Sequence, residues 1–263
     1  MDVLELVIAA TFTAEPVESP LAFWLNKLGW GQSIRFAPFN QVVQELLDPG
    51  SLFARNRSGV NVVLVRPEDW VQGLAPGEVE QRIRAAGGEF LRALRGSIDR
   101  LAAPLIVVVA PGRLATPGSI HGTAETELLR ELNVSPGVQV IGPRELESWY
   151  PVEERFDPEA EAQGRIPFTP EMFAALATAI VRRVRALRQP AIKVIVVDAD
   201  QTLWGGVAAE DGPQGVRFEP GHLELQRRLL RQAEAGRLLC LCSKNSESFQ
   251  PKVRWVRRRG VTE

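Results

Sequence analysis

Two aspartates that directly follow an apolar run are the residues of this sequence best suited to chemistry. The run Lys193–Val197 has the length of a buried strand, and Asp198 and Asp200 come directly after it. Catalytic and binding residues of α/β proteins gather at the carboxyl edge of the sheet, where such a strand ends. One carboxylate there can attack phosphorus and form an aspartyl-phosphate while its neighbour transfers protons. The pair therefore indicates phosphoryl transfer.

The Asp-x-Asp pattern alone leaves two other interpretations open. In nucleotide-sugar glycosyltransferases the same pair binds a divalent metal. Asp198 or Asp200 could also have a purely structural role and cap the next element. Short motifs are shared by unrelated proteins, so the surrounding sequence has to separate these interpretations.

The residues that follow predict a small flap, a helix and a second strand. Asp211-Gly212 is typical of a hairpin turn, so residues 207–218 should form a β flap over the acids. Pro220–Ala235 has an amphipathic pattern and should be a helix that stops before Gly236. Leu238–Cys242 is then a second buried strand.

A right-handed crossover makes the two strands parallel, so that both end at one sheet edge. Ser243, which directly follows the second strand, should therefore lie beside Asp198 and Asp200. A glycosyltransferase has no use for this serine or for the flap, and the phosphoryl interpretation is favoured.

These segments resemble the haloacid-dehalogenase (HAD) superfamily and, more narrowly, its FkbH-like branch, which is associated with polyketide and nonribosomal-peptide assembly lines. The resemblance is carried by residues 198–206 with their Trp-Gly-Gly, by the turn at 210–212, and by Cys242-Ser243-Lys244-Asn245. It extends upstream to residues 164–176.

The resemblance implies a role for each matching residue. Asp198 would be the nucleophile and a ligand of Mg²⁺, and Asp200 would be the general acid/base with its backbone carbonyl on the metal. Thr202 would steady the loop, and the phosphate group would be bound by the residues Thr202, Ser243, Lys244 and Asn245. The implied activity loads a glyceryl unit from a phosphorylated small molecule onto an acyl carrier protein of an assembly-line module, with loss of phosphate.

Two parts of the family pattern are missing: a later Lys, and further acids that complete the metal site. Residues 246–263 are too few for another crossover, which alone takes about a dozen residues or more. They form a basic tail that we expect to be solvated rather than to bind nucleic acid. We expect a shortened family member, and a catalytically incomplete adaptor that docks a carrier protein is the alternative function.

Cys242 has two interpretations. Beside Ser243, its thiol could hold an acyl group before transfer to a carrier. Cysteine is also among the most buried residue types, and a packing role is favoured.

The first part of the chain alternates strands and helices, which predicts a parallel doubly wound sheet of the Rossmann or flavodoxin-like class. The expected strands are Glu5–Thr11, Ile34–Ala37, Val60–Val65, Leu105–Val109 and Val138–Ile141, and the expected helices are Pro20–Leu28, Gln41–Leu47, Gly77–Leu94, Thr123–Leu132 and Pro170–Leu187. We expect an N-terminal domain over residues 1–165, a linker and connecting helix over 166–190, and a partial HAD-type domain over 191–263.

This N-terminal part resembles the SGNH-hydrolase-like region that precedes the phosphatase unit in FkbH-like proteins. It lacks that fold's Gly-Asp-Ser nucleophile, because the first strand is followed by Thr11-Phe12-Thr13. Neither His121 nor His222 has an Asp three residues before it. We therefore expect carrier docking or capping of the active site from this region rather than hydrolysis, with Thr11 and Thr13 as turn residues.

Composition limits the remaining possibilities. The sequence has 263 residues, of which 45% are hydrophobic, with a net charge of -1. That balance gives no support to nucleic-acid binding, and no apolar run approaches the ~20 residues of a membrane span. Two cysteines and an N-terminus without a basic leader region favour a cytoplasmic protein.

Overall fold

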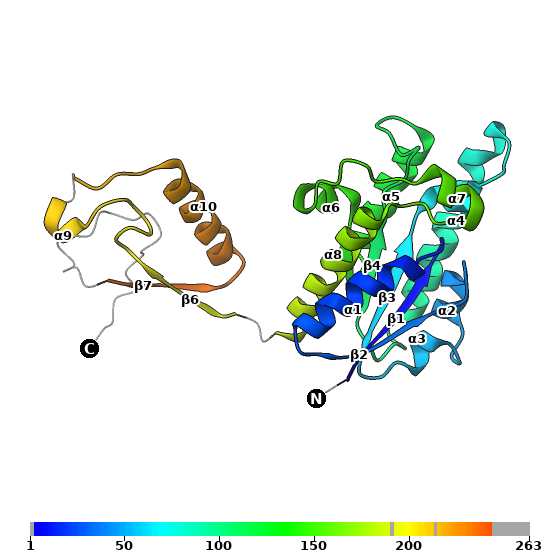
Figure 1. Ribbon diagram of the computed structural model, residues 1–263, viewed down its shortest axis with the longest axis horizontal. Helices are drawn as coiled ribbons and strands as arrows, with labels where there is room; N and C mark the ends of the chain where they lie inside the picture. The colour runs from blue at the N-terminus through cyan, green and yellow to red at the C-terminus, as the bar shows by residue number, and fades with distance from the viewer. Residues whose placement is uncertain (1–2, 190–191, 213–214, 244–263) are drawn as a thin grey trace. The chain divides into compact units, whose positions relative to one another are not determined.

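The computed structural model describes residues 3–189, 192–212 and 215–243. The chain divides into two compact units, Met1–Arg188 and Gln189–Glu263. Each unit contains its own parallel sheet (Figure 1). The structure therefore confirms the expected α/β class.

The first unit is built on a five-stranded parallel sheet with the order β2-β1-β3-β4-β5. This is the strand order of flavodoxin-like sheets. All four strand pairs are parallel. The strands are β1 (Val3–Ala10), β2 (Gly31–Phe36), β3 (Val60–Val65), β4 (Leu105–Val109) and β5 (Val138–Ile141).

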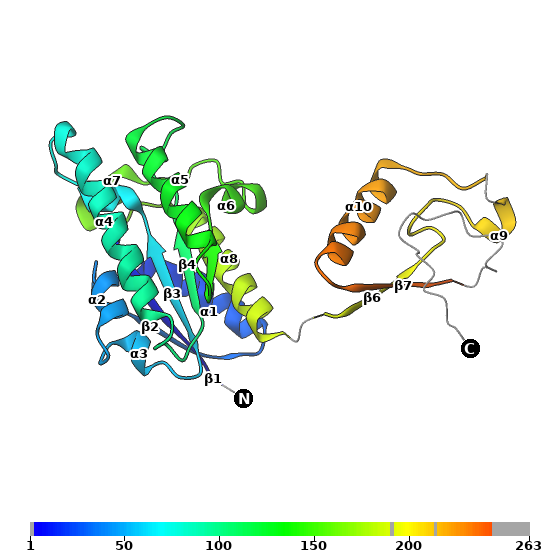
Figure 2. The ribbon, with the colours of Figure 1, turned by 180° about the vertical axis from the view of Figure 1, so that it is seen from behind.

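Helices cover both faces of this sheet, and the residues of β1 alternate between the two cores. Leu4, Leu6 and Ile8 pack with helices α1 and α8, which lie in front of the sheet in Figure 1. Val7 and Ala9 pack on the other side with α2, α4 and α5, which come to the front in Figure 2. Every residue of the central strands β3 and β4 is buried, as expected for strands covered on both faces.

The helices of the first unit include several that the sequence did not predict. Those predicted are α1 (Glu18–Lys27), α2 (Val42–Leu47), α4 (Pro76–Ser97), α5 (Ile120–Asn133) and α8 (Pro170–Arg188). The additional helices are α3 (Leu52–Arg55), α6 (Pro143–Trp149), α7 (Pro158–Gly164) and the 3₁₀ turns η1 (Glu15–Val17) and η2 (Pro67–Val71). Most of these extra elements begin with Pro in the first turn, which suits a helix start.

Helix α8 differs from the connecting helix expected over residues 166–190. Phe173, Leu176 and Ile180 are almost fully buried in the first core, and the unit boundary falls after Arg188. The reason is the apolar stripe of α8, which covers the sheet beside α1. This segment is therefore part of the first unit's core.

The second unit contains the parallel pair β6 (Val194–Asp198) and β7 (Leu238–Cys242), joined through α9 (Ala208–Asp211) and α10 (Pro220–Glu234). The parallel pairing agrees with the sequence prediction. One side of the pair packs in a small core with Trp204 and with Leu229 of α10.

The strands β6 and β7 are not buried on both sides, as the apolar runs had suggested. Val194, Val196 and Leu238 are 45%, 63% and 66% exposed, because α10 covers only the opposite side. The expected β flap also differs. Asp211-Gly212 ends the short helix α9, and in the described part of residues 205–218 the antiparallel pairing consists of one bridge, between Gly205 and Arg217.

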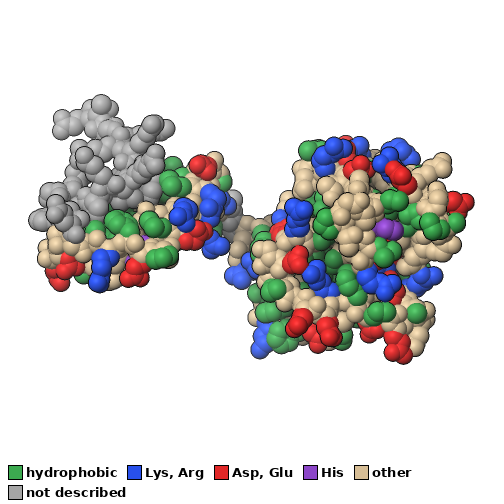
Figure 3. All heavy atoms as spheres, turned by 90° about the horizontal axis from the view of Figure 1, so that it is seen from above, with side chains coloured by type: hydrophobic (Ala, Val, Ile, Leu, Met, Phe, Trp, Pro, Cys, Tyr) green, Lys and Arg blue, Asp and Glu red, His purple; other side chains and the backbone are tan. Residues whose placement is uncertain are grey.

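Charged side chains of both signs are interspersed on the face of the first unit that Figure 3 shows. Within the described ranges, no helix is both long and apolar enough to cross a membrane.

Candidate functional site

Asp198 is the last residue of β6, at the carboxyl edge of the two-stranded sheet. In the parallel register it stands opposite Cys242, the last residue of β7. Ser243 follows Cys242 directly, so the sheet topology brings Asp198 and Ser243 to the same edge, as predicted. Asp198 is exposed, so its carboxylate is open to a ligand from solvent.

A tight turn follows the strand and carries the second acid. The backbone N–H groups of Thr202 and Leu203 both donate to the carbonyl of Ala199, at 3.3 and 2.9 Å. Gln201 has a φ of 57°, in the left-handed region that side chains other than glycine seldom adopt. Such backbone strain is found preferentially at functional sites, and here it turns the chain back immediately after Asp200.

Trp204 and Ala208 hold the Asp200 carboxylate in place. Its Oδ1 accepts a hydrogen bond from the indole Nε1 of Trp204 at 3.0 Å and one from the backbone N of Ala208 at 3.1 Å. Ala208 is the first residue of α9, so Asp200 has the structural role that we had considered as an alternative. The orientation of this half-buried side chain is therefore set before any ligand binds.

Trp204 anchors the loop that carries Asp200 to the core of the second unit. Its side chain is fully buried in the second unit's core, so it does not line an open substrate pocket. The side-chain amide of Gln226, on α10, donates to the carbonyl of Leu203 at 2.7 Å. These contacts tie the acid-bearing loop to the helix that covers the sheet.

Gly206 gives the same loop a conformation that another residue could not take. Its φ is 101°, and a Cβ atom there would lie 2.9 Å from Oδ2 of Asp211. That oxygen accepts a hydrogen bond from the backbone N of Val207 at 2.9 Å, which closes the loop onto α9. The glycine therefore serves backbone geometry.

The remaining predicted site residues differ in their burial, and two of them lie outside the described residues. Thr202 is half-buried in the turn, where its backbone is hydrogen-bonded. Lys244 and Asn245 lie outside the described residues. Cys242 is exposed, and Cys240 on the same side of β7 is exposed as well. The packing role expected for Cys242 is therefore wrong, because that side of the strand faces away from α10.

The donor set at this edge suits Mg²⁺ better than a softer metal. Asp198 offers a hard carboxylate oxygen at this edge, and the resemblance to HAD proteins implies the backbone carbonyl of Asp200 as a second oxygen ligand. Mg²⁺ commonly binds through one or two carboxylates together with water and substrate phosphate. Among the described residues no group of three or more His, Cys, Asp or Glu side chains gathers as a metal site.

A second polar cluster, which the sequence did not reveal, lies at the carboxyl edge of the first unit's sheet. Arg66 directly follows β3 and is 99% buried, with ion pairs to the carboxylates of Glu68, Asp69 and Glu161. Thr11, which directly follows β1, donates to Asp69 at 2.7 Å and accepts from the backbone N of Arg66 at 3.0 Å. One feature of the sequence could have indicated this cluster, because Thr11 and Arg66 each come directly after a buried strand.

Burial changes the ionisation of two acids near this edge. Exclusion of water raises the pKa of Asp69, although Arg66 and Thr11 act against it. Burial also raises the pKa of Glu125, on α5, to about 7. The nearby Glu68 carboxylate adds to the rise, while the Gly112 N–H and Arg144 oppose it. Folding therefore makes Glu125 bind a proton at a pH where the unfolded chain releases it.

Glu125→Gln is expected to flatten the pH dependence of stability. Between the ordinary value of 4.5 and about 7, only the folded state keeps the Glu125 proton, so the free energy of unfolding falls as pH rises through this window. The variant cannot ionise and should be more stable than the wild type at pH 8, by ~2 kcal/mol after allowance for solvent screening. Urea unfolding at pH 5 and pH 8 measures the difference.

Glu127→Gln is the control for this experiment, because Glu127 is exposed on the same helix. It should retain the pH slope of the wild type. If Glu125→Gln shows the same slope as this control, Glu125 is not the group that links folding to protonation.

Comparisons with known proteins establish the fold. No family model and no curated protein matches this sequence. Among solved structures, the chain is similar to the N-terminal part of the protein BF1531 from Bacteroides fragilis, described as containing a phosphatase domain complexed with Mg. The TM-score is 0.72 at 16% identity, and the match covers 95% of this chain and 71% of that one.

A second structure, TesA, matches with a TM-score of 0.42 at 13% identity, over 70% of this chain and 99% of that one. This likeness is too low to carry an argument. The likeness to BF1531 shows that the fold of this α/β protein, with its flavodoxin-like sheet, is shared over nearly the whole chain.

Proposed function

We propose that the second unit carries out Mg²⁺-dependent phosphoryl chemistry on a phosphorylated small molecule, with Asp198 as the nucleophile and Asp200 as the general acid/base. The observation that carries this proposal is the arrangement of the two acids. Asp198 is exposed at the end of β6, and Asp200, two residues later, lies in the tight turn with its carboxylate fixed by Trp204 and Ala208. The fold likeness to a protein described as containing a phosphatase domain with Mg supports it.

The reaction divides into two steps. A carboxylate oxygen of Asp198 forms a bond to phosphorus, the ester P–O bond breaks, and Asp200 donates a proton to the departing oxygen. Water then attacks the aspartyl-phosphate, Asp200 takes its proton, and inorganic phosphate leaves. When bound, Mg²⁺ would neutralise phosphate charge beside Asp198. Ser243, which follows β7 at the same edge, would hold a phosphate oxygen.

The finer proposal concerns the biological substrate. By resemblance to FkbH-like proteins, the chain would transfer a glyceryl unit from a phosphorylated donor to the thiol of an acyl carrier protein, releasing phosphate. This transfer would be a separate step from the phosphoryl chemistry of Asp198: the exposed thiol of Cys242, opposite Asp198 in the register, would attack the acyl carbon of an acyl-phosphate donor, the acyl C–O bond would break and phosphate would leave with the thiol proton. The carrier thiol would then displace Cys242 from the resulting thioester.

Hydrolysis of p-nitrophenyl phosphate by the purified chain tests the core of this proposal. We expect turnover with MgCl₂, a loss of at least about tenfold with excess EDTA, and recovery when Mg²⁺ is restored. Intact-mass measurement of a carrier protein then tests glyceryl loading.

An adaptor without catalysis is the second candidate, and the absence of a third acidic ligand in the described part of the chain favours it. Metal-independent background hydrolysis would rule out the enzyme and leave this candidate.

A further inference from the structure

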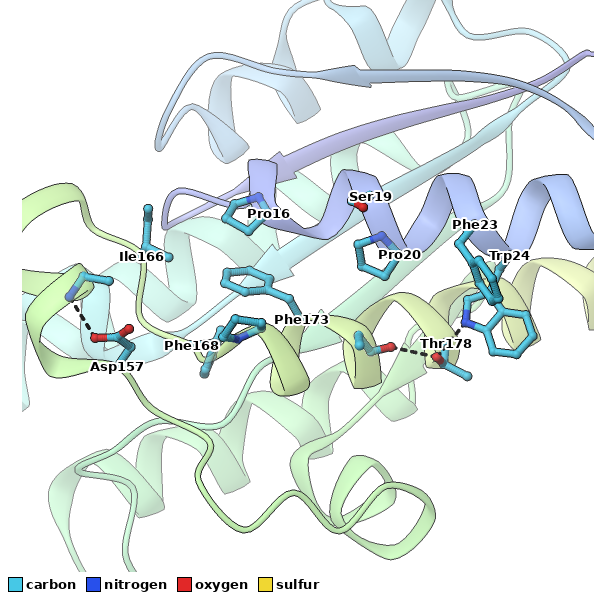
Figure 4. Close-up of a pocket in the computed structure, with 13 residues that line it drawn as sticks. Pro16, Ser19, Pro20, Phe23, Trp24, Asp157, Ile166, Phe168, Phe173 and Thr178 are labelled. Carbon is cyan, nitrogen blue, oxygen red and sulfur yellow. Dashed lines mark hydrogen bonds between the residues drawn. The ribbon is translucent and has the colours of Figure 1, made fainter.

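A wide groove runs along the outer side of α1 and α8 in the first unit (Figure 4). Its volume is about 720 Å³, within the range of ~300–1,000 Å³ that is usual for small-molecule pockets. One wall, from α1 and the residues before it, includes Pro16, Pro20, Phe23 and Trp24, and the floor includes Phe168 and Phe173.

The floor of the groove is rigid. Phe168 and Phe173 are 1% and 2% exposed, and their rings meet edge to face with centroids 5.8 Å apart. The Phe168 ring also packs against the rings of Phe12 and Phe156, with centroid distances of 5.3 and 5.8 Å. Because the core already holds these rings in place, a ligand would not have to order them, which lowers the cost of binding.

The rim presents apolar surface to water in a fixed orientation. Phe23 and Trp24 are 53% and 36% exposed and stack edge to face at 5.2 Å. The indole Nε1 of Trp24 donates to Oγ1 of Thr178 at 2.9 Å, and that hydroxyl donates to the carbonyl of Ala174 at 2.7 Å. The ring is thus held against α8.

The residues that line the groove favour an uncharged ligand. Asp157 is the one ionisable residue among those that line it, and its Oδ1 caps α7 by accepting from the backbone N of Ala160 at 2.9 Å. No lining residue is a cation that could receive an anionic ligand. The Lys27 ammonium on α1 contacts the Phe23 ring at 5.7 Å and does not line the groove.

We propose that this groove binds an uncharged, largely apolar small molecule, which lies over the Phe168 and Phe173 rings and against Phe23 and Trp24. The groove belongs to the first unit, so this proposal is independent of the function proposed for Asp198 and Asp200. Its ligand would gain chiefly from burying the exposed apolar surface of Phe23 and Trp24, at about 25 cal/mol per Å² of area removed from water.

Titration of the purified 263-residue chain with N-phenyl-1-naphthylamine, an uncharged probe whose emission rises in apolar surroundings, tests the proposal. The wild type should bind one probe per chain. Ala174→Trp should weaken binding at least about tenfold, because the indole fills the groove from an exposed position on α8. Ala186→Trp, at an exposed position of the same helix that does not line the groove, should leave binding unchanged.

A second filling variant covers the case in which Ala174→Trp does not fold. Ser19→Phe, at an exposed lining position on α1, should also weaken binding about tenfold or more. Circular dichroism confirms that each variant is folded before titration.

A charged analogue tests the uncharged character of the ligand. 1-Anilinonaphthalene-8-sulfonate has the same rings and one sulfonate, and it should bind more weakly than the uncharged probe. Tighter binding of the sulfonate would overturn the proposal, as would equal affinity of the uncharged probe for the wild type and both filling variants. A change from dimer to monomer in the filling variants, without any probe effect, would instead identify a surface for self-association.

Discussion

Asp198→Asn is expected to lower phosphate-ester turnover by about 10³-fold or more, which is the scale of loss when a covalent nucleophile is removed. The amide that replaces the carboxylate is a poor nucleophile and a weak Mg²⁺ ligand, so both proposed functions of the side chain are lost together. Asp198 is exposed, and the thermal midpoint should therefore change little. Steady-state rates with p-nitrophenyl phosphate and a thermal melt measure the two effects.

Glu234→Gln provides the control for charge, since Glu234 is exposed in the last turn of α10. It should retain wild-type turnover. Unchanged turnover in Asp198→Asn would end the assignment of Asp198 as nucleophile. A large loss of stability would mean that the variant reports on folding rather than on chemistry.

Arg66→Met is expected to destabilise the first unit by about 3–5 kcal/mol, the usual loss when one partner of a buried ion pair is removed. The guanidinium is the shared partner of the Glu68, Asp69 and Glu161 carboxylates, and it lies 5.9 Å from the centroid of the Phe168 ring. Methionine fills part of the volume and leaves these acids without their cation. Urea unfolding followed by circular dichroism measures the loss.

Arg84→Met is the matched control, because Arg84 forms a solvent-exposed ion pair with Glu80. Exposed pairs contribute about 0–1 kcal/mol. At acidic pH the cost of Arg66→Met should shrink, since burial raises the pKa of Asp69 and protonation removes the charge that Arg66 neutralises. Equal losses for the two arginine variants at neutral pH would show that the buried cluster contributes no more than a surface pair.

The sequence predicted the sheet of the first unit well because its central strands are unmistakable. Val60–Val65 and Leu105–Val109 are short apolar runs, and the structure buries every residue of both. The sequence pattern predicted β6 and β7 as parallel strands, but it also predicted that both strands would be buried, and they are partly exposed. An apolar run shows that residues are suited to a core, and it does not show whether a second layer covers them.

The candidate site was predictable in part. Asp198, Asp200 and Ser243 are close in sequence to strand ends, so the topology alone places them at one edge. The fixing of Asp200 by Trp204 and Ala208 could not be predicted, because it depends on the path of a loop. The Arg66 cluster was missed for a related reason, since Glu161 is separated from Arg66 by 95 residues.

The packing of α1 against α8 has a consequence for the order of folding during synthesis. These two helices cover the same face of the sheet, yet one begins at Glu18 and the other ends at Arg188. As the chain leaves the ribosome, the first strand and its helix emerge long before α8, and the apolar cover that α8 provides is still missing. The nascent first unit therefore cannot complete its native packing until nearly all of its residues have been translated.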